Sequence, residues 1–267
     1  MKQYIINAFS DQPFTGNPAA VCILDTWLPD KLMLAIAQQN NLSETAFAVK
    51  IGQNYHLRWF TPAAEIDLCG HATLATAFVI MNFYDTSLDT VCFDTLSGRL
   101  SVTREDERYQ MTFPSYNLTQ VPITTDMLDV IGVEPIEAWL GRDLVLVLDS
   151  EQAVRECHPQ LDKACHLDGL LLHITAKGQT DFDCVSRSFA PKLGIDEDPV
   201  CGSGHCHLAP LWSKKLNQTH IKAYQASARG GTLYCTLSEK QVLLSGTAHV
   251  FACAELFLTT HSASNIF

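Results

Sequence analysis

Basic residues are few in this sequence and almost never adjacent. There are 18 Lys and Arg against 29 Asp and Glu, a formal net charge of −11, and neither half of the chain is basic. The only adjacent basic pair is Lys214–Lys215. Nucleic acids and anionic membranes are bound through clustered Lys and Arg. The charge pattern therefore predicts neither nucleic acid nor membrane as a partner.

Long hydrophobic runs are absent as well. The segment Met1–Ala8 has one basic residue and turns polar before a hydrophobic region of signal-peptide length develops. The most apolar stretch, Ala72–Phe83, is interrupted by polar residues and is too short to span a bilayer. We therefore expect a cytoplasmic protein.

The ten cysteines include no C-x-x-C pair, which removes the commonest zinc and redox signatures. Without a secretion signal they are expected to be reduced thiols. Cys201 and Cys206, with His205 and His207 beside the second thiol, do not have the spacing of a standard ligand set. The sequence thus predicts no metal site.

Motifs for nucleotide binding and serine hydrolysis are also missing. Gly202–Gly204 lacks the third glycine of a dinucleotide fingerprint, and no Walker A or G-x-S-x-G pattern is present. No cofactor is predicted.

The chain has 267 residues, of which 47% are hydrophobic, so it is long enough to bury one large core or two smaller ones. Short β-like runs separated by turn residues dominate, with helical patterns over Lys31–Asn40, Gly70–Phe83 and Gly202–Leu216. The second helix is apolar nearly all round, so other elements must surround it. These features predict an α+β fold in which a curved sheet encloses a helix.

A polar, proline-containing segment near the middle of the chain, Phe113–Pro122, is typical of a crossover between two halves. We place the halves at residues 1–116 and 117–254, and expect a last strand at about 255–267 to pack back onto the first half. Each half would have one buried helix, and both helices begin at Cys-Gly. This similarity suggests an internal repeat.

The two Cys-Gly helix starts are candidate anion sites. Unpaired N–H groups at Gly70 and Gly202, together with the helix dipoles, favour a carboxylate or a developing enolate. They are equally compatible with ordinary helix starts.

Three further side chains could carry acid–base chemistry. Glu44 precedes an apolar strand, where partial desolvation would suit a general acid or base, although a solvated loop acid is the simpler interpretation. His71 lies one residue inside a predicted helix, where the dipole favours a neutral ring that could donate to a substrate oxygen or cap a turn. Asp198 could orient a substrate amine or hydroxyl, or start a turn.

Cys69 and Cys201 allow two interpretations. A thiol at a helix N-terminus has a lowered pKa, and two facing thiols could move protons on opposite faces of a carbon. The commoner fate of a free cysteine is to be a small buried hydrophobe.

Several motifs together resemble one family, the phenazine-biosynthesis-type (PhzF) isomerases. They are spread over nearly the whole chain in family order: Asn7–Phe9, Gly16–Val21, Asn41–Phe47, Arg58–Pro62, Asp67–Thr73, Asp198–Ser203 and Gln225–Gly231.

This resemblance implies the diaminopimelate epimerase-like fold, with two pseudo-symmetric halves, each with a sheet around a central helix, and an active site in the cleft between them. It implies a homodimer, and an isomerase that moves a proton within a dihydro-hydroxyanthranilate without a cofactor. The family's catalytic glutamate matches Glu44. Its substrate-binding positions match the following residues of this chain: Gly70, His71, Asp198, Gly202 and Ser203.

Two alternatives remain open. Cys69 and Cys201 fall where diaminopimelate epimerases carry their catalytic thiols, so a two-thiol racemase is possible, although many PhzF proteins carry threonine at the position of Cys201. The second alternative is a family member that binds a metabolite or a protein without catalysing a reaction. We expect a small carboxylate-bearing substrate, anthranilate-like or similar, and the sequence does not place the protein in phenazine synthesis.

Overall fold

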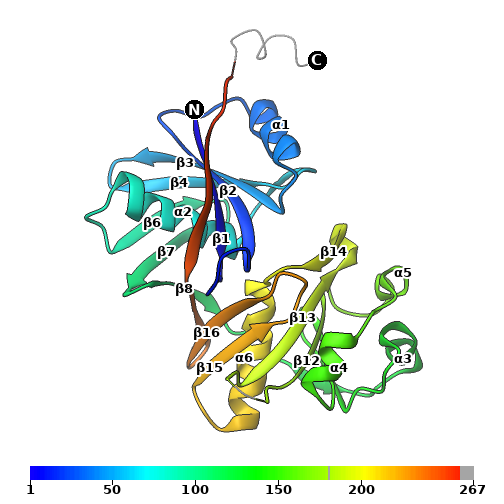
Figure 1. Cartoon of the computed structure of the whole chain (residues 1–267). Coiled ribbons are helices and arrows are strands. Elements are labelled where there is room, and N and C mark those ends of the chain that lie inside the picture. Colours follow the sequence, from blue (N-terminus) through cyan, green and yellow to red (C-terminus); the bar gives the residue numbers. More distant parts are fainter. Residues whose placement is uncertain (180, 259–267) are drawn as a thin grey trace. The chain divides into compact units, whose positions relative to one another are not determined.

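The computed structural model describes residues 1–179 and 181–258, and the chain divides into two compact units. Unit 1 is formed by Met1–Met111 and the chain from Gly246 onward, and unit 2 by Thr112–Ser245. Each unit is built mainly of β-strands with few helices (Figure 1).

The sheet of unit 1 runs in the order β18–β1–β2–β3–β4–β6–β7–β8, and β5 adds to β4. The pairs β2–β3 and β4–β6 are parallel and the others antiparallel. The strands are β1 (Lys2–Ala8), β2 (Asn17–Leu24), β3 (Glu44–Ile51), β4 (Asn54–Phe60), β5 (Glu65–Ile66), β6 (Thr90–Thr95), β7 (Gly98–Glu105), β8 (Arg108–Pro114) and β18 (Ala248–Glu255).

Helix α2 (Gly70–Val79) is the central helix of unit 1. All of its side chains except Phe78 are buried, as expected for a segment that is apolar on every face. It packs against β1, β2 and β3, so the sheet wraps around it (Figure 1). The predicted end at Phe83 is corrected: the α-helix stops at Val79 and a π-helical turn, Ile80–Tyr84, follows.

Helix α1 (Asp30–Asn40) matches the first predicted helix and packs on β3 and β4. Its buried face contributes Met33, Ile36 and Ala37 to a cluster with Phe47 and Phe60. The spacing of these apolar residues explains why this segment is helical and which face is buried.

The sheet of unit 2 runs in the order β9–β10–β11–β12–β13–β15–β16–β17, and β14 adds to β13. Here β11–β12 and β13–β15 are parallel. The strands are β9 (Thr119–Val121), β10 (Glu137–Leu140), β11 (Leu144–Val147), β12 (Leu172–Lys177), β13 (Cys184–Ala190), β14 (Ile195–Asp198), β15 (His220–Gln225), β16 (Gly231–Ser238) and β17 (Gln241–Gly246).

Helix α6 (Gly202–Leu216) has the bounds predicted from the sequence and packs against β12, β15 and β16. It buries the predicted face, including Leu208, Leu211 and Trp212. The smaller helices of this unit are α3 (Thr125–Ile131), α4 (Glu151–Glu156), α5 (Leu161–Ala164) and the 3-10 turn η2 (Pro191–Leu193).

The two sheets have the same succession of parallel and antiparallel pairs: two antiparallel, one parallel, one antiparallel, one parallel and two antiparallel. In both, the central helix follows the strand that pairs with the fifth strand of this order, and it begins at the glycine of a Cys-Gly pair. The predicted α+β fold with an internal repeat is confirmed.

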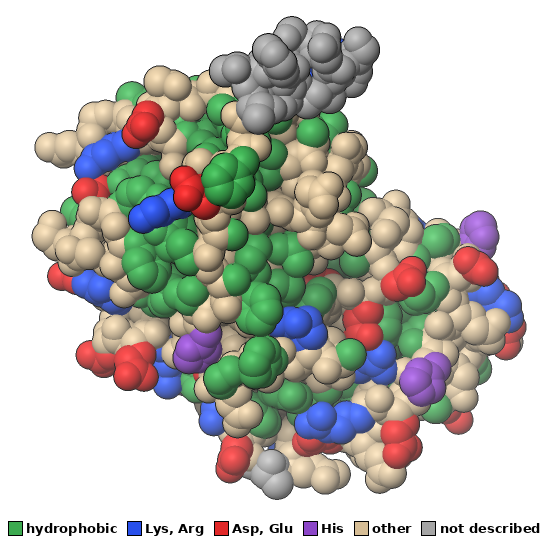
Figure 2. Space-filling model, turned by 45° about the horizontal axis from the view of Figure 1, so that its top comes forward, with side chains coloured by type: hydrophobic (Ala, Val, Ile, Leu, Met, Phe, Trp, Pro, Cys, Tyr) green, Lys and Arg blue, Asp and Glu red, His purple; other side chains and the backbone are tan. Residues whose placement is uncertain are grey.

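The strand that returns to unit 1 is β18, which pairs with β1 from Lys2 opposite Glu255 to Ala8 opposite Ala248. Of the last strand expected from the sequence, residues 259–267 lie outside the described part of the chain. No helix within residues 1–179 and 181–258 is long and apolar enough to cross a membrane. On the face in Figure 2, Lys and Arg side chains are scattered among Asp and Glu.

Candidate active site

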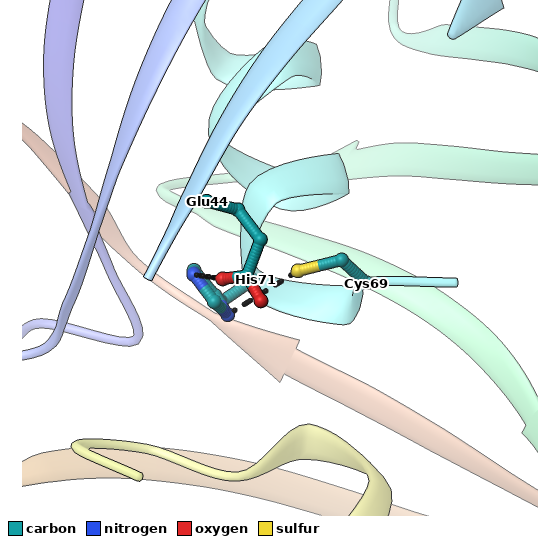
Figure 3. Close-up of side chains that lie close together, drawn as sticks. All are labelled: Glu44, Cys69 and His71. Carbon is teal, nitrogen blue, oxygen red and sulfur yellow. Dashed lines mark hydrogen bonds and ion pairs between the residues drawn. The ribbon is translucent and has the colours of Figure 1, made fainter. Parts of the chain in front are cut away.

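Three residues singled out in the sequence, Glu44, Cys69 and His71, lie together in unit 1 (Figure 3). Glu44 is the first residue of β3, Cys69 is the residue before α2, and His71 is in the first turn of α2. The close packing of α2 against β3 brings the two segments together. All three side chains are buried.

His71 lies between the other two side chains. Its Nε2 is 3.0 Å from Glu44 Oε2, and its Nδ1 is 3.5 Å from Cys69 Sγ. Both Glu44 Oε2 and His71 Nε2 are buried without an aligned hydrogen-bond partner among the described residues, so their contact is an ion pair of poor hydrogen-bond geometry. Buried polar atoms are normally paired, so each exception calls for an explanation, and contact with a ligand is one.

Glu44 is only 7% exposed, so the solvated loop acid considered from the sequence is wrong. A side-chain network fixes the strand start beside it: Asn40 Nδ2 donates to Thr45 Oγ1 at 3.0 Å, and Gln3 Nε2 donates to Asn40 Oδ1 at 3.0 Å. These bonds join the end of α1, β1 and β3, and they limit the freedom of Glu44.

The predicted neutral state of His71 is corrected by its surroundings. Burial by itself would lower the pKa of His71, but the Cys69 sulfur and the Glu44 carboxylate raise it well above the usual value. A carboxylate at 3.0 Å in a buried site outweighs the partial positive charge of the helix start. The structure thus favours a charged imidazole ring next to the glutamate.

The thiol of Cys69 has a raised pKa, chiefly because burial disfavours the thiolate and the nearby Glu44 adds to this. The pKa of Cys201 is raised well above its usual value for the same first reason, with Asp198 adding to it. The lowered thiol pKa that the helix starts suggested is therefore wrong for both. Their burial supports the simpler interpretation of two small buried side chains.

The remaining predicted residues belong to unit 2 and lie at the start of α6. Cys201 precedes the helix, and its sulfur accepts a hydrogen bond from the Gly204 N–H at 3.3 Å. Ser203 Oγ is 3.5 Å from Cys201 Sγ. Gly202 is the first helical residue, as Gly70 is in α2, so both glycines present N–H groups without intrahelical partners.

Asp198 ends β14, and its Oδ1 accepts a hydrogen bond from the Val200 N–H at 3.1 Å. This contact is the turn-forming role considered from the sequence. The substrate-orienting role of Asp198 stays a prediction.

Sequence reasoning missed a second group of buried polar residues in unit 2, formed by Arg142, Asp143, His173 and His207. Asp143 directly precedes the apolar strand β11, and a charged Arg-Asp pair before a wholly buried strand was the available signal.

Within the described residues two sets of three donors are close enough to hold a metal ion: Glu44, Cys69 and His71, and Asp143, His173 and His207. In the second set, the Arg142 guanidinium already contacts both oxygens of Asp143. In the first, the raised pKa of Cys69 opposes the deprotonation that a thiolate ligand requires. The prediction that no metal is used stays a prediction.

The fold is an α+β fold of two units, each with a sheet around a central helix, and unit 1 holds a buried acid–imidazole pair; the comparisons identify the family. The sequence matches the family of phenazine biosynthesis-like proteins, PhzC-PhzF, over residues 6–254. The chain belongs to this family. A likeness to a hydroxyproline epimerase of Agrobacterium vitis, with a TM-score of 0.58 at 10% identity over 95% of this chain and 91% of the other, shows the shared fold alone.

Individual relatives agree with this assignment. The chain is 45% identical to an uncharacterized isomerase of Pseudomonas aeruginosa, covering 95% of this chain and 97% of the relative. It is 36% identical to the human phenazine biosynthesis-like domain-containing protein, over 88% and 91% of the two chains. A PhzF family structure from Enterococcus faecalis superposes with a TM-score of 0.94 at 50% identity, over 96% and 99%.

Proposed function

We propose that the protein is an isomerase that moves a proton between two carbons of a small carboxylic acid, with Glu44 as the acid and base. The names of its relatives support an isomerase-like enzyme, and the family model matches most of the chain. The observation that carries the proposal is the buried Glu44–His71 pair, whose facing atoms lack aligned hydrogen-bond partners.

In this mechanism the Glu44 carboxylate takes a proton from a substrate carbon, and the electron pair of the broken C–H bond moves into the conjugated acid. The Glu44 carboxyl proton exchanges with solvent, and the enolate-like anion then accepts a proton from this carboxyl group at a different carbon. The net charge of the site is unchanged and no oxidant is needed. Because Glu44 is held at the start of β3, it can serve both carbons only if the substrate lies across its carboxylate.

His71 would stabilise the carboxylate form of Glu44 and the anionic intermediate through its positive charge. Amide N–H groups at Gly70 and Gly202, together with the Ser203 hydroxyl, would bind the anionic end of the substrate, and Asp198 would orient an amine or hydroxyl. Cys69 and Cys201 would line the site as neutral thiols. That a single substrate meets residues of both units stays a prediction.

The first test is a change of Glu44. With 2,3-dihydro-3-hydroxyanthranilate and a panel of related cyclic and amino-acid-like acids, the unchanged protein should incorporate deuterium from D₂O at a substrate carbon. Glu44→Gln removes the proton acceptor and keeps the shape, so the incorporation rate should fall by about 10²–10⁴-fold. Mass spectrometry of the recovered acid measures this.

A matched control is Glu105→Gln, which makes the same chemical change at an exposed residue of unit 1 and should leave the rate unchanged. Full turnover by Glu44→Gln would contradict the proposal. Deuterium incorporation that survived Glu44→Gln and vanished in Cys201→Ser would instead support the two-thiol mechanism. No incorporation with any acid of the panel would point to a binding protein.

A further inference from the structure

Unit 2 contains a buried polar network that the proposed chemistry does not use. At its centre is Asp143, whose side chain is wholly buried. Arg142 binds both of its oxygens, with Nη2 at 2.6 Å from Oδ2 and Nε at 2.9 Å from Oδ1. His173 Nε2 lies 3.0 Å from Oδ2. Burial would raise the pKa of Asp143, but the hydrogen bonds from His173 and Arg142 hold it well below its usual value.

One branch of the network leads through Arg142 to the first turn of α6. The same Nη2 that contacts Asp143 is 3.1 Å from Ser203 Oγ. The guanidinium lies over the ring of Tyr116, 4.9 Å from its centroid, and that ring stacks on His207 at 4.4 Å. Asp143 therefore holds the guanidinium in one orientation against Ser203.

The other branch leads through His173 to the turn before α6. His173 Nδ1 is 2.9 Å from Ser188 Oγ, which is 3.4 Å from Gln225 Oε1. Gln225 then binds the chain on both sides of that turn: its Oε1 accepts from the Cys201 N–H at 2.8 Å, and its Nε2 donates to the Asp198 carbonyl at 2.5 Å. A buried amide with both ends satisfied fixes the backbone that it joins.

The ring of His173 also touches the helix directly. A Cβ placed on Gly204 would be 2.6 Å from His173 Cε1, closer than any side chain allows. Only glycine at this position lets the first turn of α6 lie against the ring. The network and the packing thus both hold the same short segment.

The acid–imidazole pairs of the two units differ in a way that separates their roles. In unit 1, Glu44 Oε2 and His71 Nε2 lack aligned partners. In unit 2, both oxygens of Asp143 accept hydrogen bonds from Arg142, and Oδ1 also accepts one from the Leu171 N–H at 3.4 Å. An acid–imidazole pair whose carboxylate oxygens both accept hydrogen bonds can exchange a proton with a ligand only by breaking several of these buried bonds, which costs free energy.

We propose that Asp143 and His173 are positioning residues, which hold Ser203 and the Asp198–Cys201 turn in the geometry that binds the anionic end of the substrate. The identity of the ligand rests on the proposed function. The holding of the segment does not, because it follows from contacts within unit 2.

The chain offers a matched pair of variants for the test. Ser188 and Ser186 are both wholly buried serines of β13, two residues apart. Ser188 joins His173 to Gln225, whereas the Ser186 hydroxyl has no hydrogen-bond partner in the described structure. Ser188→Ala therefore removes the hydroxyl group that links His173 to Gln225, whereas Ser186→Ala removes a hydroxyl group that links no residues of the network.

The readout in the full-length protein is amide hydrogen exchange by NMR. Ser188→Ala should speed the exchange of the Cys201 and His205 amides about fivefold, the effect of one weakened buried hydrogen bond. Amides later in α6, such as Leu211, should not change, and Ser186→Ala should change none of them. Equal effects of both variants, or a uniform increase over unit 2, would overturn the inference.

In the deuterium incorporation assay, Ser188→Ala should raise KM about fivefold and change kcat by less than about twofold, because binding geometry and not the base is altered. A fall in kcat alone would contradict positioning.

Asp143→Asn tests the branch through Arg142 and should speed hydrogen exchange of the Arg142 Nε–H. An unchanged exchange rate in a folded variant would exclude this branch. Absence of substrate turnover in the unchanged protein would refute the proposed function, and the amide measurements would still decide the inference.

Discussion

The pKa of His71 in unit 1 and the pKa values of His205 and His207 in unit 2 are shifted in opposite directions because their neighbours differ. His71 has the Glu44 carboxylate at 3.0 Å and a pKa raised well above its usual value. His205 donates from Nδ1 to the Cys201 carbonyl at 2.7 Å, and burial lowers its pKa to about 4. Burial also lowers the pKa of His207 to about 4. Desolvation determines the direction of a histidine's pKa shift where no carboxylate with an oxygen free of other hydrogen bonds lies close to the ring.

We therefore expect His71 to be charged at pH 7 and His205 and His207 to be neutral, as measured by side-chain nitrogen chemical shifts. Glu44→Gln should move the His71 transition to lower pH by at least about one unit, since it removes the carboxylate. Glu105→Gln should not. An unchanged His71 transition in Glu44→Gln would show that the carboxylate does not hold the charge.

These shifts also predict the pH dependence of stability. The folded pKa of His71 lies above the unfolded value of 6.5, so its stabilisation is present below pH 6.5 and is lost as the pH rises through the folded pKa. For His205 the pH dependence has the opposite sign. Its folded pKa of about 4 lies below the unfolded value of 6.5, so the folded protein loses stability as the pH falls from 6.5 towards 4.

His205→Asn should reduce that acid-side loss by on the order of 1 kcal/mol between pH 6.5 and 5. Urea unfolding at a series of pH values checks this, with the exposed His220→Asn as the control. A loss of the same size in both variants would contradict the assignment.

At the scale of single elements, the start of α6 is held both by hydrogen bonds and by close packing against His173. Gly204→Ala should destabilise the protein by about 1–3 kcal/mol, because the new Cβ would meet the hydrogen-bonded His173 ring at 2.6 Å. Gly202→Ala is the matched control: its Cβ would meet only Leu244 Cδ1 at 3.8 Å, and the change should stay within about 0.5 kcal/mol. Chemical denaturation of both variants gives the comparison, and equal losses would contradict it.

The helices were the most predictable elements. The bounds of α6 were predicted to the residue: the helix begins at the glycine of Cys201-Gly202, and in the structure Asn217 ends it in the left-handed conformation. The apolar character of Gly70–Phe83 predicted a buried helix but not the change to π-helix at Ile80, since apolar side chains on every face carry no signal for the hydrogen-bond pattern.

At the scale of the whole molecule, the two units repeat one strand order with different residues at their centres. In the acid–imidazole pair of unit 1 the facing atoms lack aligned hydrogen-bond partners, whereas in unit 2 both oxygens of the acid accept hydrogen bonds. We infer that the repeat has divided the tasks of chemistry and positioning between its copies.

Family resemblance also predicts a homodimer. Sedimentation equilibrium at micromolar concentration should therefore give twice the chain mass of 29.5 kDa. Glu44→Gln should sediment in the same way, because its side chain is buried within unit 1. A mass equal to one chain would refute the dimer.

The sequence by itself determined the family, the α+β class, the repeat and the candidate Glu44, because these depend on local motifs and on hydrophobic periodicity. Tertiary structure alone decided the raised pKa of His71, the raised pKa of both candidate thiols and the network around Asp143. The reason is physical: desolvation and charge pairing act between residues such as Asp143 and His173, which are close in space and distant along the chain.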